Sequence, residues 1–416
     1  MKKIVKMSLV AAVAVAGLTA ANAQPLEEAI KGVDVSGTVV YRYNDAKTKD
    51  GSTAATNNYK IGLNLASKVN EDVKLNTRFI VGQPSVVAGG ANNSDLGFAT
   101  LDSSTNGDQG VEVLLSNVYF GYTGIKNTTV NVGKQGLTTP WTVAVDSDGN
   151  EQTGTGILAL STVGPVTLAG AYFNQTNLGT SGNFVGANSP VLANLINVAS
   201  NVNGAANAGA QDVMTVGILG NVGPVALDAW YLDMAEIFDT YTVGALAKFD
   251  VASVNFGIDA RYTSLELDND VATAAGLDGD NNMYKIALTA KAGIVDGKLA
   301  YAASDEDGGI VSLDNDATTD IQGWAVNMTG KADAEFIQAV VGVQVVDSLH
   351  LSANYVTVEY NDKDMEDTEV YAQAVYNMSK NLSSYVRFGT REVENHVANT
   401  KTESDYTGRL QVQYSF

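Results

Sequence analysis

Apolar and polar residues alternate along most of this chain in short runs. Successive side chains of a β-strand point to opposite faces, so alternation at period two predicts a strand with one apolar and one polar face. Arginine or lysine facing lipid at mid-membrane costs roughly 2–4 kcal/mol, and the charges of these runs keep to the polar face. In the run 33–44 the two parities are Val35, Val39, Tyr41 and Tyr43 against Asp34, Ser36, Thr38 and Arg42.

Alternately short and long polar connectors separate these runs. Short ones such as Val163-Gly164-Pro165 carry turn-forming residues, and the long ones cover 83–110, 136–155, 174–212, 264–282 and 305–334. Short turns at one end and long loops at the other are typical of an outer-membrane barrel, so the predicted fold is all-β: a transmembrane antiparallel β-barrel of about 18 strands with long extracellular loops. The strands are expected near 33–44, 58–67, 73–82, 111–123, 128–135, 156–162, 166–173, 213–221, 225–232, 241–249, 254–263, 283–292, 298–304, 335–346, 349–360, 369–378, 382–391 and 405–416.

The N-terminus has the pattern of a secretory signal peptide. Basic residues at 2, 3 and 6 precede a short apolar run, and Ala21-Asn22-Ala23 matches a small-x-small cleavage site. The apolar run is too short to span a bilayer as a helix. We therefore expect residues 1–23 to be removed and residues 24–416 to form the barrel.

The last eight residues predict a closing strand. Leu410, Val412, Tyr414 and Phe416 alternate with polar neighbours. An even number of strands brings both chain ends to the same side, where the first and last strands can pair and leave no open edge in lipid. A terminal aromatic such as Phe416 also resembles the signal that outer-membrane assembly machinery reads.

Charge and cysteine content exclude several classes of protein. The chain has 46 acidic and 25 basic residues and a net charge of −21, which argues against nucleic-acid binding and suits a vestibule that concentrates cations. The acids could equally solvate loops and hold divalent ions against lipopolysaccharide. The sequence contains no cysteine, so thiolate metal sites and cysteine nucleophiles are absent.

Three segments resemble a known family. They are similar to Campylobacter-type major outer membrane proteins, and they comprise residues 25–37 with Tyr41-Arg42-Tyr43, Gly133-Lys134-Gln135 before the loop that contains Trp141, and residues 409–416. The resemblance implies an 18-stranded, homotrimeric, general-diffusion porin. It also implies insertion by the barrel assembly machinery and contact with outer-membrane lipid and lipopolysaccharide.

In such trimeric porins the third loop folds into the lumen, and here that loop corresponds to 136–155. Its acids Asp146, Asp148 and Glu151 are expected at the pore constriction. Acids facing a basic wall would create a transverse field in a water-filled pore that selects by size and charge. Alternatively the loop points outward and the cations pair with neighbouring strands. The expected basic wall consists of Arg42, Lys60, Lys74, Arg78, Arg387, Arg391 and Arg409.

No cofactor is expected, and metal binding stays open. Hard cations such as Ca²⁺ need several oxygen ligands, and no acidic loop cluster has EF-hand spacing. Solvated loop tips are the alternative, and the sequence defines no ligand set. The clusters are Asp268/Asp270, Asp278/Asp280 with Asn281 and Asn282, Asp314/Asp316 and the group Asp362, Asp364, Glu366 and Asp367.

The function that fits these observations is a water-filled, cation-preferring outer-membrane channel for passive diffusion of small hydrophilic solutes and ions. One alternative is a non-conducting barrel used for adhesion or envelope structure. Another is an outer-membrane hydrolase. The two histidines, His350 and His396, are expected near opposite membrane faces and cannot share a catalytic site, so we expect no enzyme.

Overall fold

The computed structural model describes residues 32–49, 51–82, 98–100, 112–147, 150–178, 181, 211–361 and 364–416. The predicted signal peptide 1–23, Asp148 and Asp362 lie outside these residues.

A single antiparallel sheet contains all the strands of the described residues. Eighteen of them are long, and β4 has two residues, which pair with β2. The strands are β1 (Val33–Thr48), β2 (Thr53–Lys68), β3 (Val73–Gly82), β4 (Ala99–Thr100), β5 (Glu112–Tyr122), β6 (Thr128–Gly136), β7 (Thr153–Val163), β8 (Val166–Thr176), β9 (Val213–Val222), β10 (Val225–Met234), β11 (Phe238–Val251), β12 (Val254–Leu267), β13 (Asp280–Ala292), β14 (Val295–Ser304), β15 (Glu335–Val346), β16 (Leu349–Tyr360), β17 (Met365–Asn377), β18 (Leu382–Asn395) and β19 (Thr400–Ser415).

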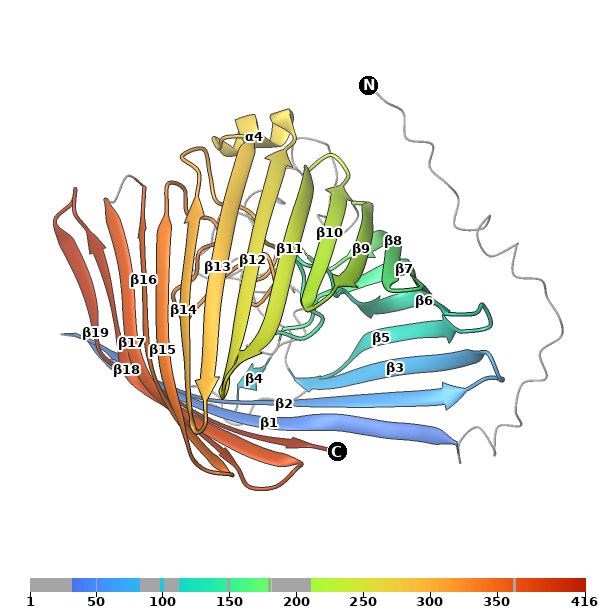
Figure 1. The fold of residues 1–416 in the computed structure, drawn as a ribbon, viewed down its shortest axis with the longest axis horizontal. Coiled ribbons are helices and arrows are strands. Elements are labelled where there is room, and N and C mark those ends of the chain that lie inside the picture. Colours follow the sequence, from blue (N-terminus) through green and yellow to red (C-terminus); the bar gives the residue numbers. More distant parts are fainter. Residues whose placement is uncertain are drawn as a thin grey trace.

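The first and last strands close the sheet into a barrel. β1 pairs with β19 from Thr38 opposite Ser415 onward (Figure 1). Beyond that register, Gly37 and Phe416 exchange two backbone N–H···O bonds of 2.9 and 3.0 Å. Gly37 permits this approach, because a Cβ there would lie 2.8 Å from the Phe416 ring. The closed 18-stranded barrel predicted from the alternation is therefore confirmed.

Turn chemistry sets the short end of the barrel. The connections between β7 and β8 and between β9 and β10 are two-residue turns, Gly164-Pro165 and Gly223-Pro224. Both glycines have φ near +60°, a conformation that costs other residues energy. The first of these turns lies where the Gly164-Pro165 pair predicts it.

The strands extend further at the long-loop end than the alternation predicted. The connector expected at 264–282 contains the end of β12, the helix α4 (Asn269–Ala275) and the start of β13 (Figure 1). The side chain of Asp268 accepts a hydrogen bond from the Asp270 N–H at the start of α4, and Gly276 ends it in the left-handed conformation. The helix is too short to cross a membrane, and no helix of the described residues is long and apolar enough to do so.

The parity of the side chains separates the outside of the barrel from its inside. On β1, Val35 is 54% exposed and Val39 40%, whereas Arg42 on the other parity is 4% exposed. Arg42 is buried because chain fills part of the barrel at its level. Apolar side chains on the outer parity form the surface that lipid covers, as expected for a transmembrane barrel.

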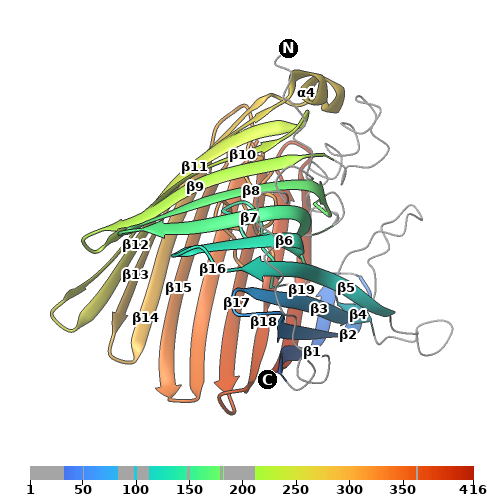
Figure 2. The same ribbon diagram turned by 90° about the vertical axis from the view of Figure 1, so that its right-hand side faces the viewer.

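Two loops fold into the ring of strands and fill part of it, as both views show (Figure 1, Figure 2). They are the third loop, 137–152, and the seventh loop, 305–334. Residues of both pack against the inner faces of the strands, with Trp141 of the third loop and Val311 and Met328 of the seventh loop fully buried. The inward third loop was predicted, and the inward seventh loop was not.

Deleting Phe416 is expected to reduce the amount of folded protein in the outer membrane strongly, while synthesis continues. The deletion removes both backbone bonds to Gly37 and the ring that stacks on Tyr414 at 5.8 Å. The quantity to measure is the amount of folded barrel in outer-membrane fractions, detected by its heat-dependent mobility in gel electrophoresis. Phe416→Tyr keeps the chain length and the aromatic ring and serves as control, and normal amounts of the deletion variant would contradict the proposed assembly role.

Candidate functional site: the inward loops and the pore wall

The third and seventh loops are joined by hydrogen bonds inside the barrel. Trp141 and Pro140 accept backbone bonds from Leu313 and Thr319, at 3.0 and 2.9 Å. The Gln152 side chain donates to the Leu313 carbonyl at 2.7 Å. Burial of Trp141 in the apolar core beside Leu313 adds to this contact, so the two loops form one internal structure that narrows the lumen.

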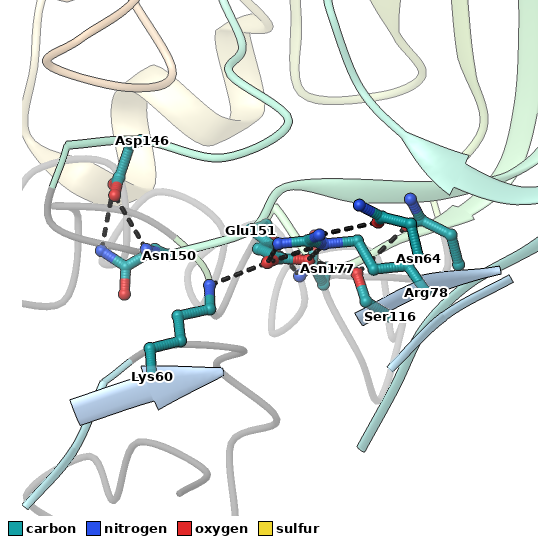
Figure 3. Close-up of polar contacts among 9 residues, drawn as sticks. Lys60, Asn64, Arg78, Ser116, Asp146, Asn150, Glu151 and Asn177 are labelled. Atoms are coloured by element: carbon teal, nitrogen blue, oxygen red, sulfur yellow. Dashed lines mark hydrogen bonds and ion pairs between the residues drawn. The ribbon is translucent and has the colours of Figure 1, made fainter. Parts of the chain in front are cut away.

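Glu151 anchors the third loop to the barrel wall (Figure 3). Lys60 on β2 lies 2.8 Å from its Oε1, and Arg78 on β3 donates to both carboxylate oxygens at 2.7–3.1 Å. The Ser116 hydroxyl on β5 also donates to it. The Glu151 side chain is only 1% exposed. The Glu151 carboxylate therefore touches Lys60 and Arg78 directly, and no water-filled passage separates this acid from the basic wall.

Two cations, Lys60 and Arg78, therefore contact the single carboxylate of Glu151 at this anchor. Burial alone would raise the pKa of Glu151, but the hydrogen bonds and charges of Arg78 and Lys60 outweigh it and hold that pKa below the usual range. Glu151 is ionised at neutral pH. The cluster carries a net positive charge, and it fixes the loop against β2 and β3.

A second cluster of acids lies where the two loops meet. Oxygen atoms of Asp146, Asp314 and Asp316 all lie within 4.8 Å of one another. Asp146 accepts two bonds from Asn150 (Figure 3), and Asp316 accepts from the Ser147 N–H. Asp314 is fully buried, and its Oδ2 has no hydrogen-bond partner. Burial, and then the charge of Asp146, raise the pKa of Asp314 to about 8.

The remaining predicted wall residues differ in their contacts. Arg42 donates to the Ser147 carbonyl of the third loop and to Gln411, and Arg391 makes a two-pronged ion pair with Asp367. Lys74 is exposed near the short-turn end of β3. Arg387 and Arg409 both lie against Trp324 of the seventh loop.

The histidines lie at opposite ends of the barrel. His350 follows the short turn before β16 and bonds Asp296 at 2.8 Å, whereas His396 follows β18 at the long-loop end. Glu366 and Glu394 lie beside His396, with ligand atoms within 4.8 Å of one another. His396 and the two glutamates lie at the long-loop end, and the two histidines share no site.

The sequence matches the family model described as "Campylobacter major outer membrane protein" over residues 1–416. The chain belongs to this family. With the closed barrel and its inward loops, the membership places the protein in the outer membrane as a channel protein and not an enzyme. No curated protein matches the sequence.

Solved outer-membrane barrels share the fold. Pseudomonas aeruginosa OccK8 (OprE) has a TM-score of 0.69 and 13% identity, over 93% of this chain and 98% of that one. Acinetobacter baumannii OccAB3 has a TM-score of 0.69 and 13% identity, over 93% of this chain and 99% of that one. Pseudomonas aeruginosa OccK1 (OpdK) has a TM-score of 0.68 and 12% identity, over 93% of this chain and 99% of that one. At these identities the likeness concerns the fold.

Proposed function

We propose that the protein is a water-filled, cation-preferring channel for passive diffusion of small hydrophilic solutes and ions, with its constriction at the joined third and seventh loops. The observation that carries the proposal is the acid cluster Asp146, Asp314 and Asp316 at the junction of two loops inside the barrel. Asp148 belongs to the same proposed constriction. A fixed charge in a narrow, low-dielectric passage acts on ions more strongly than the same charge on an outer loop.

The basic residues moderate this preference without reversing it. Of the predicted wall, Arg391 is paired one-to-one with Asp367, whereas Lys60 and Arg78 share the single carboxylate of Glu151 and keep one net positive charge. Paired charges contribute little field at a distance. The remaining wall charges and the acid cluster leave a transverse field across the passage.

Neutralising two acids of the cluster together, Asp146→Asn with Asp316→Asn, should lower the K⁺/Cl⁻ permeability ratio. Charged clefts carry potentials of several kT, so we expect a fall of roughly threefold or more. Reversal potentials in a KCl gradient across planar bilayers measure it, with a chelator present so that no divalent cation neutralises the cluster.

The matched control is Asp270→Asn with Asp278→Asn, which removes two exposed acids at the long-loop end. Salt screens such charges over about 8 Å at physiological ionic strength, so this variant should shift the potential less. Anion preference in the wild type would refute the cation preference, and equal shifts would remove the cluster from the constriction. A barrel that conducts no ions would favour the adhesion or envelope role.

We further propose that Asp146, Asp314 and Asp316 hold a divalent cation such as Ca²⁺. Hard cations take several carboxylate oxygens, and a buried, unpartnered Oδ2 of Asp314 supports a ligand there. The pair Asp314/Asp316 belongs to the seventh loop, and Asp146 of the third loop adds a third carboxylate to it. The test is how the stability of the protein depends on calcium and on pH.

We also propose a homotrimer in contact with outer-membrane lipid and lipopolysaccharide, inserted by the barrel assembly machinery. The family resemblance supports the trimer, and the exposed apolar outer parity supports the lipid contact. Sedimentation in detergent measures the number of copies, and a monomer there would contradict the trimer.

A further inference from the structure

Two arginines stand directly opposite each other on neighbouring strands of the pore wall. Arg387 on β18 pairs in register with Arg409 on β19. Like charges at such positions destabilise a sheet. Among the described residues Arg387 has no carboxylate partner, since its Nε donates to the neutral amide of Gln373. The positive charge of Arg387 is therefore not compensated by an ion pair.

Aromatic rings surround the Arg387 guanidinium in place of an acid. Its Cζ lies 4.9 Å from the Tyr385 ring centroid, 5.8 Å from Trp324 and 5.9 Å from Tyr371. The Cζ of Arg409 lies 5.6 Å from the same Trp324 ring. These are cation–π distances. Because Trp324 belongs to the inward seventh loop, the whole group faces the interior of the barrel.

The position of Trp324 is fixed by its own backbone. The N–H groups of Trp324 and Ala325 both donate to the buried carboxylate of Glu369 on β17. The Trp324 and Tyr371 rings meet edge to face at 5.5 Å. Glu369 is thus occupied in holding the loop, and the group of rings and guanidinium is formed in advance of any solute.

We propose that Arg387, Arg409, Trp324 and Tyr385 form a subsite for planar organic carboxylates inside the channel. A guanidinium presents several N–H donors in one plane and pairs with carboxylate oxygens in a two-pronged geometry. Among the described residues only the Nε of Arg387 donates a hydrogen bond to a protein acceptor, which leaves its terminal nitrogens for a solute. The half-buried rings of Trp324 and Tyr385 supply flat apolar surface for the body of an aromatic or conjugated acid.

This subsite rests on the proposed channel and refines it. The preference for small cations depends on the summed field of the constriction, whereas the subsite acts on a solute that contacts guanidinium and rings together. A carboxylate without a flat body gains only the charge contact. Benzoate is therefore expected to bind more tightly than acetate.

The experiment measures benzoate in single-channel recordings in KCl. Benzoate should reduce the wild-type conductance in a saturable manner, and acetate should do so only at higher concentration. Arg387→Gln should raise the half-blocking concentration of benzoate roughly tenfold or more, the loss expected for a charge-assisted contact. Arg387→Lys keeps the charge without the planar fork and should restore only part of the affinity.

Lys74→Gln is the matched control, because it removes one exposed positive charge from the same predicted wall near the short-turn end. It should change the half-blocking concentration less than Arg387→Gln does. Equal shifts in the two variants would reduce the effect to net charge, and absence of saturable block in the wild type would overturn the subsite.

KCl conductance without benzoate separates this inference from the function on which it rests. A wild type that conducts KCl and ignores benzoate keeps the channel and loses the subsite. A wild type that conducts nothing removes both. If Arg387→Gln alters the KCl conductance and leaves the benzoate block unchanged, Arg387 only anchors the loop and the subsite is refuted.

Discussion

Glu151→Gln is expected to lower the free energy of unfolding by about 3–5 kcal/mol, the cost of removing one partner of a buried ion pair. In the wild type the Glu151 side chain is 1% exposed and its charge compensates the Lys60 ammonium and the Arg78 guanidinium. The substitution removes that negative charge and leaves the two positive charges close together. It also weakens the attachment of the third loop to β2 and β3. Urea titration in detergent micelles measures the stability, and single-channel current noise reports the loop.

Asp405→Asn is the control, because it breaks an exposed pair with Lys47 of similar length, 2.6 Å. Exposed pairs contribute about 0.2–1 kcal/mol, so the control should lose little stability. Adding Lys60→Gln to Glu151→Gln should recover part of the loss by removing one uncompensated charge. If Glu151→Gln is as stable as the control variant, Glu151 is not the anchor of the loop.

The barrel was predictable because lipid enforces a local rule. Each strand must present apolar side chains outward at every second position, and each short turn must reverse the chain, so the information lies in adjacent residues. The turn at Gly164-Pro165 and the closing strand up to Phe416 were predicted in this way. Strand ends at the long-loop side were less predictable, because β12 continues to Leu267 beyond the membrane pattern.

The inward seventh loop was missed although the sequence carries a signal for it. A loop that projects into water would expose the apolar side chains of Val311, Ile321, Val326 and Met328. In the structure all four are buried. Apolar residues at intervals within a long polar connector therefore indicate a loop that packs inside a barrel. The expectation that long connectors project outward hid this signal.

The contacts of the site depend on residues distant in sequence. Glu151 and Asp146 are near neighbours along the third loop, yet one contacts β2 and β3 and the other lies beside Asp314. No local pattern distinguishes them, since the difference depends on which way each side chain points after the loop has folded. The pair of Arg387 with Arg409 likewise depends on strand register, which alternation alone does not set.

The stability of the protein is expected to fall as pH rises from 6 to 8 in a chelating buffer. The pKa of Asp314 is about 8 in the folded protein and 3.8 for a free side chain. The folded state therefore retains a proton that the unfolded state has lost, and stability from this group is complete below pH 3.8 and is lost as pH passes 8. Each pH unit within that window costs about 1.4 kcal/mol per retained proton.

Asp320 contributes in the same direction at lower pH. Burial raises its pKa to about 6, so most of its effect is complete before the window from pH 6 to 8 begins. Asp314→Asn should remove the slope in that window, because an amide does not titrate. Asp270→Asn, an exposed acid of the long-loop end, should leave the slope unchanged. Urea titrations at each pH measure all three proteins.

Calcium should reverse this slope if the three carboxylates are its ligands. A carboxylate binds a metal ion in its deprotonated form, so binding strengthens as pH rises. Millimolar CaCl₂ should stabilise the wild type at pH 8 and have little effect at pH 5, and Asp314→Asn should lose most of the stabilisation at pH 8. A wild type whose stability is flat between pH 6 and 8 in chelator would contradict the burial of the Asp314 carboxyl group with its Oδ2 unpartnered. A calcium effect of equal size in wild type and Asp314→Asn would move the ion to another group of acids and leave the titration of Asp314 intact.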